Sequence, residues 1–154
     1  MNPVTQSKNT TILPVVIALT LVCFAFSPTA RATCQDACLT NNSTAQGDNA
    51  LVSNTGFYNT AFGFSALFSN TSGGFNTAVG WEALDNNTAG DDNTAVGLEA
   101  LQSNTTGSFN TAVDLQSLNS NRSDGNTAVG WVALQQNTTG GSNTAPRTCA
   151  RTLC

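Results

Sequence analysis

Hydrophobic and polar positions recur in one short pattern along most of this chain. In the first five copies, the tripeptide Asn-Thr-Ala is followed by Phe or Val, then Gly or Asp, then a bulky apolar residue, and soon afterwards by Ala-Leu or Ser-Leu. Successive tripeptides lie 17, 17, 17, 16 and 17 residues apart, starting at Asn59, Asn76, Asn93, Asn110, Asn126 and Asn143. One copy is too short to bury its own apolar face, so the pattern predicts that the copies stack on one another.

Each copy is expected to form one coil of a solenoid. The segment Thr-Ala-Val-Gly favours a short strand between turn-forming residues. The Asn-Thr-Thr-Gly segment predicts a turn, because Asn tolerates the left-handed backbone region and Gly adopts it freely. The three residues from the bulky apolar position to the Leu suit a helical turn as well as a second bent strand. The predicted fold is all-β, a β-solenoid (β-roll) of about six coils of 16–17 residues, with one short helical turn per coil as an open alternative.

The apolar columns of the repeat predict the core. Small residues in the Ala and Gly columns suit a narrow interior, and the larger apolar residues of three columns are expected to fill it. These are Leu67, Leu84, Leu101, Leu118, Leu134, Val79, Val96, Val113, Val129, Trp81 and Trp131. The Asn that opens each tripeptide has two interpretations: a turn requires it, or its amide bonds the next coil in a ladder.

Four segments are predicted along the chain. Residues 1–32 contain Lys8, an apolar run from Ile12 to Phe26 and small residues around Arg31, which is typical of a cleaved secretory signal peptide. An uncleaved anchor is the alternative, but the run is shorter than the ~20 residues of a membrane-spanning helix. Residues 33–49 are expected to form a Cys-containing N-terminal cap, 50–145 the solenoid and 146–154 a Cys-containing tail. The predicted location is therefore extracellular or at the cell surface, with no membrane contact in the mature form.

Cysteines and charge narrow the choice of partners. After removal of the signal peptide, Cys34 and Cys38 precede the repeats and Cys149 and Cys154 follow them, which in a secreted chain predicts disulfides within or between chains. Three arginines then stand against nine acidic residues, a net charge of −6. Binding to nucleic acid is not expected, because phosphate contacts require clusters of Lys and Arg.

Catalysis and metal binding are not expected either. The chain has no His, which removes the commonest general base and metal ligand. Its Ser and Thr hydroxyls have no neighbouring base that would activate them. The acidic residues do not recur in one column, so no calcium site is predicted. We therefore expect a protein that is not an enzyme and has no cofactor.

Glycan attachment sites recur with the repeat. The motif Asn-x-Ser/Thr occurs once per copy, with acceptors at Asn70, Asn86, Asn104, Asn121 and Asn137, and Asn41 and Asn42 precede the array. Turns rich in Asn and Thr create such motifs by composition alone. The functional alternative is a row of glycans along one edge of the solenoid.

The repeats resemble a known family. Asn-Thr-Ala-Val-Gly columns separated by Asn-Thr-Thr-Gly turns, over Ala50 to Ala145, are similar to the head repeats of YadA-like trimeric autotransporter adhesins and to related repeats of phage tail fibres. The resemblance implies a parallel β-roll, association of three chains, and a head that binds extracellular matrix or host surfaces.

Three functions are therefore weighed. The leading hypothesis is a secreted structural subunit that stacks end to end into a fibre and is locked by the terminal cysteines, because open strand edges at unlike ends seek partners. The alternative is a trimeric adhesin head that binds matrix or carbohydrate. A minor alternative is an ice-binding solenoid, suggested by a column of threonines at Thr60, Thr77, Thr94, Thr111, Thr127 and Thr144.

Overall fold

The computed structural model describes residues 41–146. The predicted signal peptide, most of the predicted N-terminal cap, residues 147–154 and all four predicted disulfide cysteines, Cys34, Cys38, Cys149 and Cys154, lie outside the described residues. Within 41–146 the chain forms seven short strands. They are β1 (Thr44–Gln46), β2 (Thr60–Phe62), β3 (Thr77–Val79), β4 (Thr94–Val96), β5 (Thr111–Val113), β6 (Thr127–Val129) and β7 (Thr144–Pro146).

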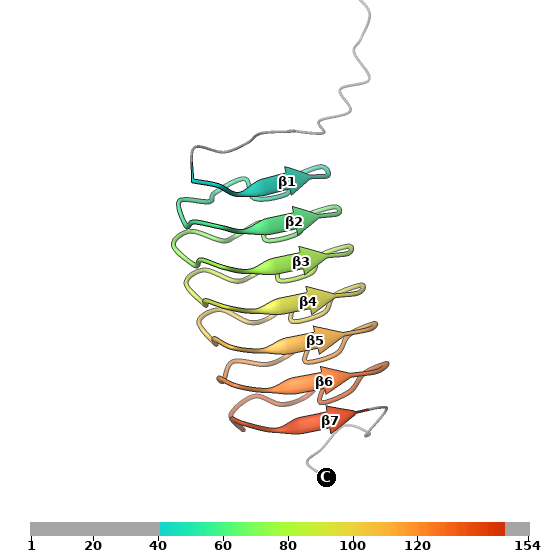
Figure 1. The fold of residues 1–154 in the computed structure, drawn as a ribbon. Helices are drawn as coiled ribbons and strands as arrows, with labels where there is room; N and C mark the ends of the chain where they lie inside the picture. The colour runs from blue at the N-terminus through green and yellow to red at the C-terminus, as the bar shows by residue number, and fades with distance from the viewer. Residues whose placement is uncertain (1–40, 147–154) are drawn as a thin grey trace, which may run out of the picture. The chain divides into compact units, whose positions relative to one another are not determined.

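The strands stack in chain order into one parallel sheet, as Figure 1 shows. Every strand pairs with the next in the same register, so that Thr lies over Thr and Ala over Ala through all seven coils. A single repeat period of nearly constant length fixes this register, because each coil returns the chain to the same point one strand spacing of about 4.8 Å further on. The predicted β-solenoid is confirmed.

The wall that faces the sheet is neither a helix nor a regular strand. In the described part of the chain no helix forms between the bulky apolar column and the Leu column. Instead, each coil carries two residues of positive φ there, such as Glu82 and Leu84, both at 53°. Their amides donate to neighbouring coils: Glu82 N to Phe64 O over 2.8 Å and Leu84 N to Ala100 O over 3.0 Å. Because the bonds run between coils, a second hydrogen-bonded ladder closes the solenoid without helical bonds.

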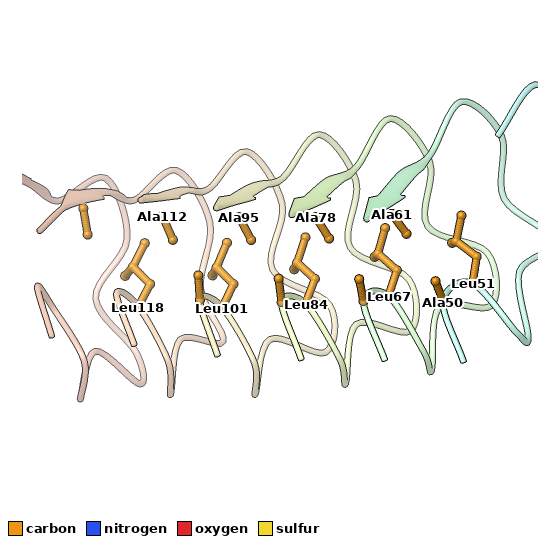
Figure 2. Packing of buried hydrophobic residues seen from close by; sticks show 14 of the residues in the cluster. Ala50, Leu51, Ala61, Leu67, Ala78, Leu84, Ala95, Leu101, Ala112 and Leu118 are labelled. Atoms are coloured by element: carbon orange, nitrogen blue, oxygen red, sulfur yellow. The ribbon is translucent and has the colours of Figure 1, made fainter. Parts of the chain in front are cut away.

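Alanine and leucine form the core. The Leu column from Leu67 to Leu118 is fully buried, and Leu134 is buried near the end of the stack. The central Ala of every strand points at this column, and a second Ala column precedes the Leu (Figure 2). Every residue of the buried apolar cluster in the described part of the chain is alanine or leucine, so these columns together fill the interior.

The prediction that the Val and Trp columns belong to the core is wrong. Side chains alternate between the two faces of a strand, so in Thr-Ala-Val only the Ala points inward. Val96 and Val129 are exposed and Val79 and Val113 are half-buried. Trp81 and Trp131 are 52% and 59% exposed.

The solenoid begins earlier than expected. Strand β1 lies inside the segment predicted as a cap, and residues 43–47 form a further copy of the repeat in which Ser43 replaces the usual Asn. The buried Ser43 Oγ accepts a hydrogen bond from Asn59 N at 3.0 Å, as Asn59 Oδ1 does from Asn76 N at 2.9 Å. Because of Ser43 the Asn-Thr-Ala motif is absent from this copy, but the serine hydroxyl still accepts the hydrogen bond from the next coil.

Buried asparagines form two internal ladders. The first contains the Asn of each tripeptide, and the second contains Asn54, Asn70, Asn87, Asn104, Asn121 and Asn137. Asn76 and Asn87 both donate through Nδ2 to Gly90 O, at 2.8 and 3.0 Å, and the two ladders meet in the same way on Gly73 O and Gly107 O. The ladder interpretation is confirmed. None of these asparagines has a positive φ, so tolerance of the left-handed region does not explain them, but Asn70 and Asn87 also bond the carbonyl three residues on in their own turns, and the two interpretations hold together.

Candidate interaction surfaces

An exposed apolar stripe runs along one corner of the solenoid. It consists of the residue after each Ala of β2 to β6 and the residue two positions later, and we call it the corner stripe. Its members are Phe62, Val79, Val96, Val113, Val129, Phe64, Trp81, Leu98, Leu115 and Trp131. Phe64 and Trp81, one coil apart, stack with ring centroids 4.5 Å apart. Since all members are exposed or half-buried, the stripe contributes little to the core.

Glycine between the two columns of the stripe makes this corner possible. Gly80 has a φ of 140°, and a Cβ on it would lie 2.4 Å from the backbone oxygen of Gly97 in the next coil. At Gly80 the coils therefore approach too closely for a side chain, and Asp114, the one residue other than glycine between the two columns of the stripe, has a φ of 97°. The sharp corner that results holds the valine and tryptophan columns outside the core.

Polar side chains beyond this corner form hydrogen bonds with one another. Gln102 Nε2 donates to Glu82 Oε2 and Gln116 Nε2 to Glu99 Oε2, both over 2.6 Å. Burial, and then the nearby Glu82 carboxylate, raise the pKa of Asp85 above its usual range. The carboxylates of Glu82 and Glu99 therefore take part in hydrogen bonds between coils, which occupy an oxygen of each.

Threonines fall into two classes. Turn threonines bond the next coil: Thr71 Oγ1 donates to Thr88 O at 2.8 Å, and Thr88 Oγ1 to Thr105 O at 3.0 Å. The strand threonines suggested as an ice-binding column point outward in register, and within residues 41–146 their hydroxyls make no hydrogen bond to protein. The neighbouring outward column is valine rather than a second threonine column. The sheet therefore presents one line of hydroxyls beside one line of apolar groups.

A second set of exposed rings lies on the turn side of the coil. Tyr58, Phe75 and Phe109 each stand directly before a ladder asparagine, and we call them the aromatic column. Their exposed fractions are 52%, 58% and 65%. Tyr58 and Phe75 stack with centroids 5.0 Å apart and planes at 18°. The sequence analysis missed this column, because the equivalent position occurs once in each of the seven described coils and is aromatic in only three of them.

The predicted row of glycans does not fit the folded coils. Asn70, Asn104 and Asn121 are fully buried ladder members whose Nδ2 groups donate to backbone oxygens of their own turns. A sugar on that nitrogen would have to leave the interior. Asn41 is buried as well, and its Nδ2 donates to Gly56 O.

Two of the remaining acceptors are better placed for a glycan. Asn42 and Asn86 are exposed. Asn137 is half-buried, but its Nδ2 donates to Asn121 Oδ1 and Gly140 O, as the Nδ2 groups of the buried acceptors donate within the ladder. In its copy Asn86 precedes the ladder member Asn87, so the motif there falls outside the ladder. Glycosylation at these positions stays a prediction.

Among residues 41–146, no group of three or more His, Cys, Asp or Glu side chains is placed to hold a metal ion. The same part of the chain contains no helix with the length and apolar character needed to cross a membrane. Comparison with protein-family models found no match, and comparisons with curated proteins and with solved structures found none either. The surfaces of residues 41–146 are therefore the guide to function.

Proposed function

We propose that the chain is a secreted structural subunit whose solenoids associate side by side through the corner stripe. The observation that carries the proposal is the stripe itself: ten apolar side chains in two adjacent columns over five coils, all at least partly exposed to solvent. Contiguous apolar surface of this kind on a soluble protein usually marks an interaction site. Secretion itself remains the expectation raised by residues 1–32.

A second copy of the chain is the partner that the stripe fits best. Its members repeat once per coil, at about 4.8 Å, so two parallel solenoids can match column against column along their length. Full burial of one such side chain contributes about 1.5–3 kcal/mol. Partial burial of ten can therefore offset the roughly 4–15 kcal/mol that association costs in lost freedom.

Contact between the ends of two solenoids has less support, because proline removes a hydrogen-bond donor from β7, the last strand of the described residues. Thr127 N donates to Asn143 O in the next coil over 2.8 Å. Amides alternate in direction along a strand, so the amide two residues further on faces the same neighbour. In β7 that position is Pro146, which has no N–H to offer another coil. Proline on an edge strand typically protects that edge from pairing.

We therefore place the contact between copies on the side of the solenoid. A closed bundle of three is the assembly that the resemblance to YadA-like heads implies. The roles of Cys34, Cys38, Cys149 and Cys154 in linking ends stay predictions, since these residues lie outside the described part of the chain.

Sedimentation equilibrium of the secreted full-length protein tests the proposal. We expect a discrete oligomer, and we expect the double variant Trp81→Gln/Trp131→Gln to shift it to monomer because the two largest side chains of the stripe are lost. Phe68→Gln is the matched control, because Phe68 is an exposed aromatic residue outside the stripe. A monomeric wild type, or an open-ended polymer that both tryptophan substitutions leave unchanged, would contradict side-by-side association.

A further inference from the structure

Exposed apolar side chains gather on the first coils of the described solenoid, outside the corner stripe. We call this group the N-terminal belt. Its members are Val52, Phe57, Tyr58, Phe68 and Phe75, and each is between 40% and 59% exposed. All five lie between β1 and β3, at one end of the stack (Figure 1).

The fold does not require apolar side chains at these positions. The position of Val52 and Phe68 is polar in the later coils, where it holds Asp85, Gln102, Asn119 and Gln135. The position of Phe57 later holds Asp91, Ser108 and Asp124. The core consists of alanine and leucine from other columns, so packing inside the solenoid does not explain the belt.

Charge is absent from the same part of the chain. No charged residue occurs from 49 to 81, whereas every charged residue of the described solenoid except Asp48 lies between Glu82 and Asp124. The pairing of β1 with β2 aligns Asp48 with Phe64, so it lies in a column of the corner stripe and not in a belt column. Because removal of a charge from water is costly, the uncharged coils are the part of the solenoid that can leave water most easily.

We propose that the N-terminal belt inserts into the interface of a neutral lipid bilayer. Aromatic side chains are favoured at the boundary between water and membrane, and Phe is typical of the apolar face of proteins that lie on a bilayer. The inference departs from the expectation that the mature chain makes no membrane contact.

A bilayer fits the belt better than a rigid partner, because the side chains lie on more than one face. Tyr58 and Phe75 stand directly before strand coils on the turn side. Val52 and Phe68 follow the buried Leu51 and Leu67 on the wall that faces the sheet. A second copy of the chain covers one face at a time, whereas lipids can close around both.

Charge also selects the kind of lipid. Residues 41–146 contain eight acidic residues and one basic residue, Arg122. Anionic headgroups attract clusters of Lys and Arg and repel a chain of this charge. Binding should therefore depend on apolar burial in a neutral bilayer and respond little to salt.

The belt lies at the end of the solenoid that follows the predicted signal peptide. Residues 27–40 connect the apolar run from Ile12 to Phe26 with the described coils and span at most about 50 Å when extended. While that run is in the membrane, the belt is therefore within reach of the same bilayer.

Sedimentation of the secreted protein with lipid vesicles tests the inference. The probes are vesicles of phosphatidylcholine alone and vesicles of phosphatidylcholine mixed with phosphatidylserine. We expect binding to the neutral vesicles, unchanged by salt, and weaker binding to the anionic ones. No binding to phosphatidylcholine, or binding to the anionic vesicles alone, would overturn the inference.

The variants Phe75→Ser and Phe68→Gln separate binding from folding. Each introduces a residue that the same position carries in later coils, Ser142 in the first case and Gln102 in the second, so circular dichroism and unfolding temperature should match the wild type. We expect each variant to bind neutral vesicles about tenfold more weakly or worse, because an aromatic side chain no longer leaves water.

Phe109→Ser is the matched control. Phe109 occupies the position of Phe75 two coils later and is 65% exposed, but Asp91 and Asp92 precede it by one coil and Asp124 follows it. The acidic coils should stay in water, so this variant should bind vesicles like the wild type. An equal loss in Phe75→Ser and Phe109→Ser, or no loss in either belt variant, would contradict the role of the belt.

This inference stands apart from the self-association proposed above. Phe75→Ser and Phe68→Gln change no member of the corner stripe, so their oligomeric state should match that of the wild type. The variant Trp81→Gln/Trp131→Gln leaves the N-terminal belt intact and should still bind neutral vesicles.

Discussion

At the scale of single residues, a buried asparagine connects three coils. Asn93 donates through N and Nδ2 to Asn76 Oδ1, at 3.0 and 3.1 Å, and through Nδ2 to Gly107 O at 2.8 Å. Its own Oδ1 accepts from N and Nδ2 of Asn110, both at 3.0 Å. One side chain therefore satisfies buried groups on both neighbouring coils, which a hydrophobic residue could not do.

Replacement of this side chain should be strongly destabilising. Asn93→Ala leaves several buried polar groups on the adjoining coils without partners, at about 1–3 kcal/mol for each group that remains unsatisfied. We expect the free energy of unfolding to fall by about 3 kcal/mol or more in urea titrations. Asn86→Ala is the control, because Asn86 is exposed and makes a single bond to Gln102 O. Similar losses in the two variants would contradict a structural role for the ladder.

At the scale of one element, the 16-residue copy that starts at Asn110 interrupts the second asparagine ladder. In this copy Asn126 follows Asn121 by five positions, whereas in the preceding copy Asn110 follows Asn104 by six. Asn121 Nδ2 donates to Ser123 O at 2.7 Å, and the fully buried Asn104 Oδ1 has no partner. The loss of one turn residue therefore leaves one acceptor of the ladder unsatisfied.

Restoring the missing residue should stabilise the solenoid. A glycine inserted between Ser123 and Asp124 returns the copy to 17 residues and allows Asn121 to reach Asn104, as Asn104 reaches Asn87 over 3.0 Å. We expect a gain of about 1 kcal/mol in the free energy of unfolding. The same insertion between Thr106 and Gly107 lengthens a regular copy and should destabilise it. If the first insertion is as harmful as the second, the short copy is not the cause of the unpaired acceptor.

At the scale of the whole described solenoid, each coil contacts only its neighbours. Strand pairs form between consecutive strands alone, and the cross-coil bonds of the asparagines, threonines and turns connect adjacent coils. Stability in such an array is approximately the sum of coil terms and nearest-neighbour terms. For folding, the number of coils should therefore matter less than whether each coil is complete.

Removal of one complete coil should be tolerated. Deletion of residues 76–92 joins Phe75 to Asn93 in the same register and interrupts neither ladder at the junction. We expect a folded protein with a β-type circular dichroism spectrum and a smaller unfolding m-value, because less surface is buried. Deletion of residues 76–84 removes half a coil and should abolish folding. Loss of structure in both variants would contradict the independence of coils.

Much of this architecture could be predicted because it follows from the repeat. A constant period fixes the stacking, the register and the Leu column. Ser43 in place of Asn concealed the first coil, since a motif search does not recognise that a hydroxyl can supply the same acceptor as an amide. The aromatic column was concealed because its members share a backbone conformation rather than a residue type.

By itself, the sequence determined that the chain folds as stacked coils, since 17 residues cannot close a core without neighbours. Only the tertiary structure decided which apolar columns lie inside. Ala, Val and Trp are all apolar, and hydrophobicity alone does not distinguish them. Side chains alternate between the two faces of each strand, so the Ala of Thr-Ala-Val points inward to the leucines, and the valine and tryptophan columns lie at the surface.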